Sequence, residues 1–282
     1  MRENQVTADN KERMVQFHRD TIETRRKWIA DKKLTVTDIM KRFPRFTSTK
    51  DAIDCDLKSA DGWETALFTE RWKKIEKSLA IEILKKHGVF LEPSEFTTGI
   101  VKSYEDPLCD FNAANERTLL IFLSLPVLFP PRPSRAFKGN TIPNVTMLSK
   151  KLVRRFPNGT NLAEALQQAE SDGMIQPGLI VIGDRRYIKA DLIPIKISTS
   201  SAAESISILF AVYHIFNLSF PEHLNLVYNF LQNMVNFVEK ETSQPPNKKK
   251  KSSSKSLVVN EFSMKILNQL SNQEQIVLCD SI

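Results

Sequence analysis

Apolar residues near the N-terminus recur at the spacing of an amphipathic helix. Within residues 10–31, Val15, Ile22 and Ile29 follow one another at seven-residue intervals, so they share one helical face. Arginine and lysine are frequent among the positions between them. The pattern predicts one helix with an apolar stripe facing a core and a basic outer surface.

The next helices are indicated by their ends as well as by their stripes. Thr35 stands before an apolar stretch and Asp38 follows three positions later, which is the spacing of a capping box; Pro44 predicts the end of that helix. A longer apolar stripe marks a helix between about 62 and 87. We therefore expect residues 10–90 to form an all-helical region.

Residues 91–144 are less regular. A helix is expected from about 113 to 124, and the prolines after it favour an extended, polyproline-like chain. Pro130 and Pro133 have the spacing of a ligand for an SH3 domain, but a stiff connector between two structured parts is the favoured interpretation.

Between residues 145 and 240 the pattern changes to a mixture of helices and strands. Two helices are expected first, over 145–156 and from Asn161 to Gly173. Asn161 is a favoured N-cap residue, and Gly173 is a favoured residue just beyond a helix end.

Strands are expected next. Residues 179–182 are β-branched or leucine residues bounded by Gly178 and Gly183, which predicts a buried strand. After a turn at Asp184-Arg185, residues 187–197 contain two short strands. Pro194 confines the second of these to a sheet edge or a bend.

Two capped helices complete this part of the chain. Ser201 and Glu204 have the spacing of a full capping box, and Ser219 and Glu222 repeat the device with Pro221 in the first turn. The predicted fold class is therefore mostly helical α+β. An N-terminal helical region precedes a small α+β domain, in which a short two- or three-stranded sheet packs on helices.

These patterns divide the chain into six segments. They are disordered residues 1–9, the helical region 10–90, the connector 91–144, the α+β domain 145–240, a disordered Lys/Ser/Pro-rich linker 241–256, and a loose C-terminal tail 257–282.

The positive charge lies outside the expected α+β domain. The formal net charge is +7, to which residues 1–90 contribute +5 and residues 240–255 contribute +5, whereas residues 91–239 carry −1 and residues 256–282 carry −2. A nucleic-acid-binding fold usually carries its positive charge on the folded face. The charge distribution therefore argues against nucleic-acid binding by the α+β domain itself.

Composition predicts an intracellular protein, nuclear or cytoplasmic, that is not secreted. The three cysteines have neither a disulfide framework nor metal-ligand spacing, and the N-terminus shows no apolar leader. The longest apolar run, residues 119–129, is too short for a bilayer, which requires about 20 residues. We therefore expect no association with a membrane.

The sequence contains no nucleophile elbow, Walker A loop or dinucleotide fingerprint, so no catalytic residue, cofactor or metal ion is expected. Asp184 follows a strand and lies near Lys189 and Asp191, which leaves a cryptic hydrolase or nuclease as a minor alternative. A turn-forming role is favoured for Asp184. Of the histidines, His214 is expected in a core or an interface.

Two basic segments are candidate binding sites. The first lies between prolines and serines and matches the basic cluster that nuclear import receptors bind, with a solubilising linker as the alternative. Its residues are Lys248, Lys249, Lys250 and Lys251. The second lies on the N-terminal helix, where acidic neighbours also fit an ordinary solvated surface. Its candidate phosphate contacts are Arg19, Arg25, Arg26 and Lys27.

Two groups of residues resemble those of a protein family. The first is Arg25, Arg26, Trp28, Ile29, Val36, Ile39, Phe43 and Pro44. The second is Gly183-Asp184, Ile193-Pro194, Phe210 to Phe216, Tyr228, Phe230 and Leu231. Together they resemble an uncharacterised family of animal proteins similar to the sterile-alpha-motif-domain-containing-3-like proteins. The resemblance implies fold boundaries and no activity, and no sterile alpha motif is evident in this chain.

The sequence thus predicts a non-enzymatic interaction module that binds another protein and that works in the nucleus or the cytoplasm. A nucleic-acid-associated nuclear protein that uses the basic N-terminal helices is the alternative class. The identity of the partner and the oligomeric state do not follow from the sequence.

Overall fold

The computed structural model describes residues 8–31, 34–47, 53, 56, 65–90, 111–131, 144–191 and 193–236. The chain is mostly helical and contains one four-stranded sheet among these residues, so it belongs to the α+β class, as predicted. It folds as two compact units. The first unit comprises Met1–Thr65, Val153–Ser200 and Ser205–Ser219; the second comprises Ala66–Leu152, Ser201–Glu204 and Phe220–Ile282. Both units draw on the predicted 145–240 domain, so they cut across the predicted boundaries.

The sheet of the first unit has strand order β1-β2-β3-β4. Its strands are β1 (Val153–Phe156), β2 (Gly178–Ile182), β3 (Arg185–Ala190) and β4 (Ile193–Ile197). β1 pairs with β2 in parallel, and the other neighbours are antiparallel. Every residue of β2 is buried, as expected for the central strand of a covered sheet. Pro194 lies in β4 at a sheet edge, where a missing N–H removes no ladder hydrogen bond.

The prediction of a single helix over 145–156 was wrong. The helix α8 (Val145–Leu152) ends after eight residues, and the chain continues directly as β1. Val153 is buried in register with Leu179, and the strand follows β2 for its whole length. A short apolar stretch has no period that separates helix from strand. Pairing with β2 decides the conformation, and it adds a fourth strand to the two or three expected.

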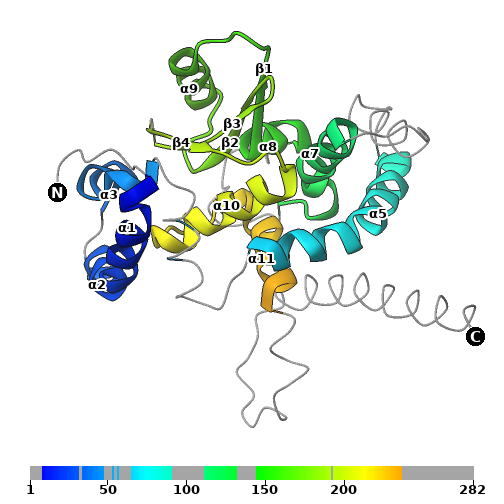
Figure 1. Cartoon of the computed structure of the whole chain (residues 1–282). Helices are drawn as coiled ribbons and strands as arrows, with labels where there is room; N and C mark the ends of the chain where they lie inside the picture. The colour runs from blue at the N-terminus through cyan, green and yellow to red at the C-terminus, as the bar shows by residue number, and fades with distance from the viewer. Residues whose placement is uncertain are drawn as a thin grey trace, which may run out of the picture. The chain divides into compact units, whose positions relative to one another are not determined.

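Helices cover both faces of the sheet (Figure 1). One face packs against α9 (Leu162–Ser171) through a buried apolar cluster. The cluster contains Ala165, Leu166, Ala169, Met174, Ile180, Ile182 and Tyr187. The other face lies over α10 (Ala202–Ile215), whose Tyr213 hydroxyl donates a hydrogen bond to the Pro177 carbonyl at 2.8 Å.

Both ends of α9 confirm the predicted caps. The Asn161 side chain accepts from the Ala163 N–H at 2.8 Å. At the other end, Gly173 has φ +87°, a left-handed conformation that costs glycine little. The Met174 N–H donates to the Ala169 carbonyl, five residues earlier, at 2.9 Å, which is the hydrogen bond that defines a Schellman motif. Local sequence signals thus fix the length of this helix.

The first unit also contains the N-terminal helices α1 (Ala8–Asp20), α2 (Ile22–Asp31) and α3 (Val36–Arg42), followed by the 3₁₀ turn η1 (Pro44–Thr47). The predicted single helix over 10–31 is interrupted at Thr21, whose hydroxyl bonds back to the Phe17 carbonyl at 2.9 Å. The capping box of α3 is present, because Thr35 accepts from the Asp38 N–H and Asp38 accepts from the Thr35 N–H.

The second unit is helical. Its elements are α5 (Thr65–Phe90), α7 (Phe111–Leu128), α8, the 3₁₀ turn η3 (Glu222–Leu224) and α11 (Asn225–Asn236). On α5, Phe68 stacks on Trp72, which contacts Phe122 of α7 edge-on with ring centroids 6.4 Å apart. Phe129 and Phe230 bring their rings to 4.8 Å. Aromatic side chains therefore form much of this core.

The helix α7 is longer than the predicted 113–124 and includes Pro126. Proline inside a helix costs about 3 kcal/mol. Every side chain from Thr118 to Pro126 is buried, and each buried leucine or phenylalanine contributes about 1.5–3 kcal/mol. Burial therefore outweighs the cost of the proline. The unit also corrects the cap predicted for Ser219: the chain enters α11 through η3, whose N-cap is Pro221 and has no side-chain cap.

Candidate functional site

The two aspartates of the minor nuclease alternative lie at opposite ends of β3. Asp184 precedes the first residue of the strand, and Asp191 follows its last residue. Seven residue steps of about 3.3 Å each place them about 23 Å apart along the strand. They cannot share a metal ion. Among the described residues, moreover, no three His, Cys, Asp or Glu side chains are grouped in a way that could hold one.

Asp191 has a structural role instead. It occupies a turn with φ +53°, and one of its carboxylate oxygens accepts hydrogen bonds from the Thr37 N–H and hydroxyl, both at 3.0 Å. Thr37 is in the first turn of α3, where backbone N–H groups lack helical partners and negative charge is favourable. Asp191 therefore joins the β3–β4 turn to α3.

Lys189 is fully buried beneath α9. In the sheet register its neighbours are Gly178 and Pro194, and the glycine leaves room for the long side chain on that face. The ammonium group lies 3.5 Å from the carboxylate of Glu170 in the last turn of α9. Arg154 makes a second ion pair there, with Asp172. Both cations lie near the negative end of the helix dipole, so they hold α9 on the sheet.

A buried polar cluster lies between the N-terminal helices and Asp56. Arg25 is 4% exposed and Asp56 is 1% exposed. One oxygen of Asp56 accepts from the Arg25 guanidinium and lies 2.8 Å from Nε2 of His18. Arg25 also donates to the His18 carbonyl at 2.8 Å. The Phe46 ring covers the cluster, 5.5 Å from the His18 ring and 5.9 Å from the guanidinium carbon.

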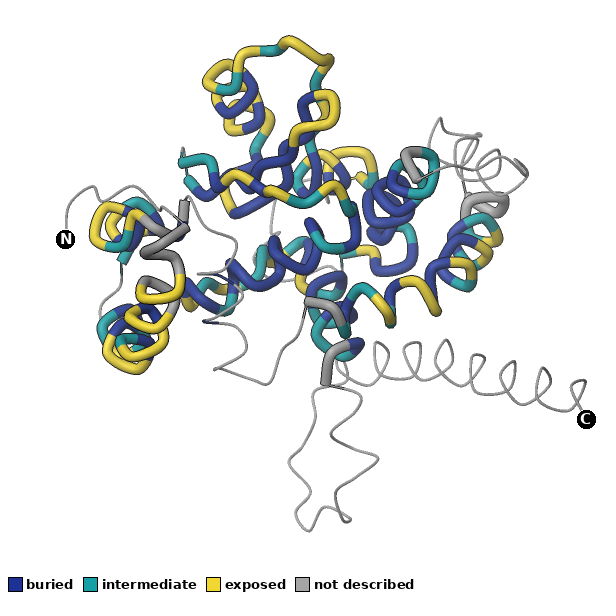
Figure 2. The backbone as a smooth tube through the Cα atoms, in the orientation of Figure 1, coloured by how far each residue is buried: buried dark blue, intermediate teal, exposed yellow. Residues whose placement is uncertain are grey.

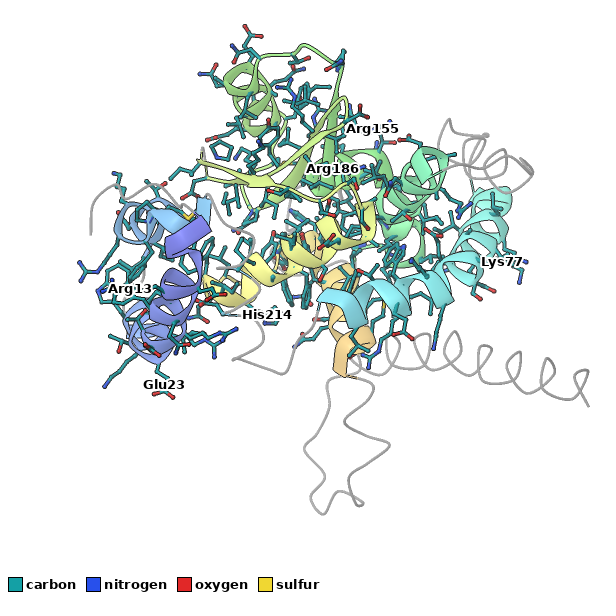
Figure 3. The ribbon with its side chains drawn as sticks, in the orientation of Figure 1. Arg13, Glu23, Lys77, Arg155, Arg186 and His214 are labelled. Carbon is teal, nitrogen blue, oxygen red and sulfur yellow. The ribbon has the colours of Figure 1, made fainter. Side chains whose placement is uncertain are left out.

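This cluster changes the interpretation of the predicted phosphate contacts. Arg25 points inward to Asp56, and half-buried Arg26 donates to the Asp56 carbonyl. Arg19 and Lys27 are exposed. They lie on helices that also expose acidic residues; Figure 3 labels the basic Arg13 on α1 and the acidic Glu23 on α2. The structure does not gather the four residues on one basic face.

The residues of the N-terminal family resemblance pack together. The Trp28 and Phe43 rings meet edge-on at 5.5 Å, and the Arg42 guanidinium lies 5.1 Å from the Trp28 ring. Trp28 and Phe43 are half-buried and Ile29 and Ile39 are buried, so packing accounts for the spacing of these residues.

Two histidines lie beside aromatic or charged neighbours. The His214 ring of α10 is 4.5 Å from Phe210 and partly buried, which agrees with a core or interface role. Burial lowers the pKa of His223, and the nearby Lys151 ammonium lowers it further. This histidine is therefore neutral at physiological pH.

Among the described residues of the second unit, the buried carboxylate is that of Glu76 on α5. It accepts from the Trp72 indole N–H at 3.3 Å and from the Thr118 hydroxyl, and it lies 3.4 Å from Arg117. Thr118 and Arg117 are on α7, so these contacts fix the register between the two helices. The carboxylate serves packing and has its hydrogen bonds satisfied.

The outer side of α5 is a basic surface that the sequence analysis did not single out. We call it the lysine face. It consists of Lys73, Lys74, Lys77, Ile81 and Lys85, all of them exposed (Figure 2). The recurrence of lysine at positions 73 and 77 on a predicted helix was a visible signal of it.

The lysine run and the comparisons with known proteins identify no further functional residue. Lys248, Lys249, Lys250 and Lys251 lie outside the described residues. No described helix is both long and apolar enough to cross a bilayer. No family model, curated protein or solved structure matches the chain.

Proposed function

We propose that this chain is a non-enzymatic module that binds another protein. The observation that carries the proposal is that the charged and histidine side chains which could serve catalysis form structural hydrogen bonds and ion pairs instead. Asp191 caps α3, and Asp56 neutralises Arg25 and holds His18. These groups join one segment of the fold to another. The exposed surface, and the lysine face in particular, is then the part that is available for function.

A nucleic-acid-associated protein is the alternative class. It depends on Arg19 and Lys27, which are exposed on the N-terminal helices. Two observations weaken it: Arg25 is directed into the interior, and Asp20 and Glu23 are exposed on the same helices. Phosphate binding favours a protein surface that is positively charged throughout, because each acidic side chain repels the phosphate backbone of the nucleic acid.

Compartment and family remain parts of the proposal. Lys248–Lys251 is a candidate nuclear import signal in a segment rich in proline and serine. The proposed relation to the sterile-alpha-motif-domain-containing-3-like proteins rests on the sequence resemblance alone, which includes Trp28 and Phe43. A reporter fused to residues 241–256 is expected to accumulate in the nucleus. An even distribution would remove the import signal from the proposal.

The interaction proposal is tested by affinity purification of the full chain, with and without nuclease treatment of the extract. A protein partner is expected to be retained equally in both arms, because the contact does not pass through nucleic acid. If the co-purified proteins are lost after nuclease treatment, the proposal is wrong and the nucleic-acid alternative is favoured. A control chain of unrelated fold with the same net charge identifies proteins retained by charge alone.

A further inference from the structure

The lysine face has a geometry set by the helix itself. Six side chains of α5 are exposed among those that the structure describes: Glu70, Lys73, Lys74, Lys77, Ile81 and Lys85. At 100° per residue these positions fall within about 120° of arc. The opposite side of α5 carries the buried core, including Trp72 and Leu79. The charged residues therefore form one continuous stripe, and Figure 3 shows Lys77 on the outer side of the helix.

The stripe carries more positive charge than its neighbours balance. Lys74 lies 3.5 Å from Glu70, and Lys85 lies 3.1 Å from Glu82. Lys73 and Lys77 have no acidic group at ion-pair distance among the described residues. They are four positions apart, so they are neighbours on the helix surface, and like charges at this spacing destabilise a helix by a few tenths of a kcal/mol. An ordinary solvated helix face mixes both signs.

An apolar side chain lies within the stripe. Ile81 is 42% exposed and stands four residues from both Lys77 and Lys85. A single exposed isoleucine needs no explanation by itself. Its position between two lysines, however, combines an apolar contact with positive charge on both sides. A surface with these two properties is complementary to a chain that alternates acidic residues with an apolar one.

We propose that the lysine face binds an acidic peptide segment of the partner protein, with one apolar residue of that segment against Ile81. The inference rests on the proposed function and adds the surface and the chemistry of the partner. From Lys73 to Lys85 the helix rises about 18 Å. An extended segment of about six residues has this length, so the expected footprint is short.

Two observations favour a peptide over nucleic acid. The lysine face contains no arginine for bidentate phosphate contacts and no exposed aromatic ring on which a base could stack. Glu70 lies at one end of the stripe, where it would repel a continuous phosphate backbone. A short acidic segment that ends before Glu70 avoids this repulsion.

The test titrates the full chain into a fluorescein-labelled peptide, Asp-Glu-Glu-Leu-Glu-Asp-Glu, and follows fluorescence anisotropy. An exposed ion pair changes affinity by a factor of about 1.5 to 5. Because Lys73→Glu/Lys77→Glu removes two pairs and adds repulsion, we expect binding at least about tenfold weaker. Lys73→Gln/Lys77→Gln should be intermediate, and Ile81→Ser should weaken binding a few-fold.

The matched control is Lys41→Glu/Lys196→Glu, which makes the same change in net charge on exposed residues of the first unit. It should leave peptide binding within about twofold of the wild type, and circular dichroism confirms that each variant is folded. Equal affinity of the wild type and Lys73→Glu/Lys77→Glu would overturn the inference. So would tighter binding of a single-stranded oligonucleotide of the same length, lost in that variant. If purified partners survive nuclease treatment but do not depend on Lys73 and Lys77, the inference fails and the proposed function stands.

Discussion

The buried cluster around Asp56 gives the most demanding stability prediction. Replacing Asp56 with asparagine keeps the shape of the side chain and removes its charge. The guanidinium of Arg25, which is 4% exposed, then stays buried without a counter-charge. The His18 imidazole loses the carboxylate that lies 2.8 Å from its Nε2. The variant therefore tests whether this cluster holds the N-terminal helices in place.

The magnitude follows from the desolvation of Arg25. Removing one partner of a buried ion pair destabilises a protein by about 3–5 kcal/mol, because the remaining charge is not solvated. Asparagine still offers one acceptor oxygen to Arg25, so the lower part of this range, about 3 kcal/mol, is expected for Asp56→Asn. Arg25→Met in the Asp56→Asn background should recover part of the loss, since it removes the uncompensated charge.

The assay is urea denaturation of the full chain followed by circular dichroism, with hydrogen exchange of residues 8–47 to assign the loss to the N-terminal helices. Asp184→Asn is the matched control, because it makes the same chemical change at an exposed turn. It should change the free energy of unfolding by less than about 0.5 kcal/mol. A loss below about 1 kcal/mol for Asp56→Asn, or no rescue by Arg25→Met, would refute the reasoning.

Two further predictions concern a turn and a titration. Gly183 has φ +55°, and a Cβ there would lie 3.0 Å from Asn158. Gly183→Ala should therefore destabilise the protein by about 1–3 kcal/mol in urea denaturation, and an unchanged free energy of unfolding would contradict the crowding argument. Because burial and Lys151 lower the pKa of folded His223 below its ordinary 6.5, the unfolded chain binds the proton more tightly, so stability should fall as pH drops below about 6.5. His223→Gln should flatten this loss between pH 7.5 and 5.5, and an unchanged pH dependence would show that another group causes it.

Local signals in the sequence were enough for several elements. Asn161 and Gly173 mark the ends of α9, because capping is a property of a few adjacent residues. The four residues of β1 were misassigned, since only the pairing of Val153 with Leu179 distinguishes the strand from a continued helix. Sequence patterns identify caps and buried strands, and they do not identify strand partners.

The candidate sites divide in the same way. The contact between Arg25 and Asp56 joins residues 31 positions apart, and no local sequence pattern predicts it. The sequence pattern therefore predicted Arg25 as a surface phosphate contact, whereas the structure shows it buried. By contrast, Lys73 and Lys77 could have been recognised from a spacing of four on a predicted helix, because helix geometry alone makes them neighbours.

Binding of a partner protein through the lysine face is tested by quantitative mass spectrometry of proteins retained from a nuclease-treated extract. The three chains compared are the wild type, Lys73→Glu/Lys77→Glu and Lys41→Glu/Lys196→Glu. The wild type and Lys41→Glu/Lys196→Glu are expected to retain a shared partner with an acidic segment, and Lys73→Glu/Lys77→Glu is expected to lose it. Retention of the same proteins by all three chains, or of none by the wild type, would show that the lysine face does not bind the partner.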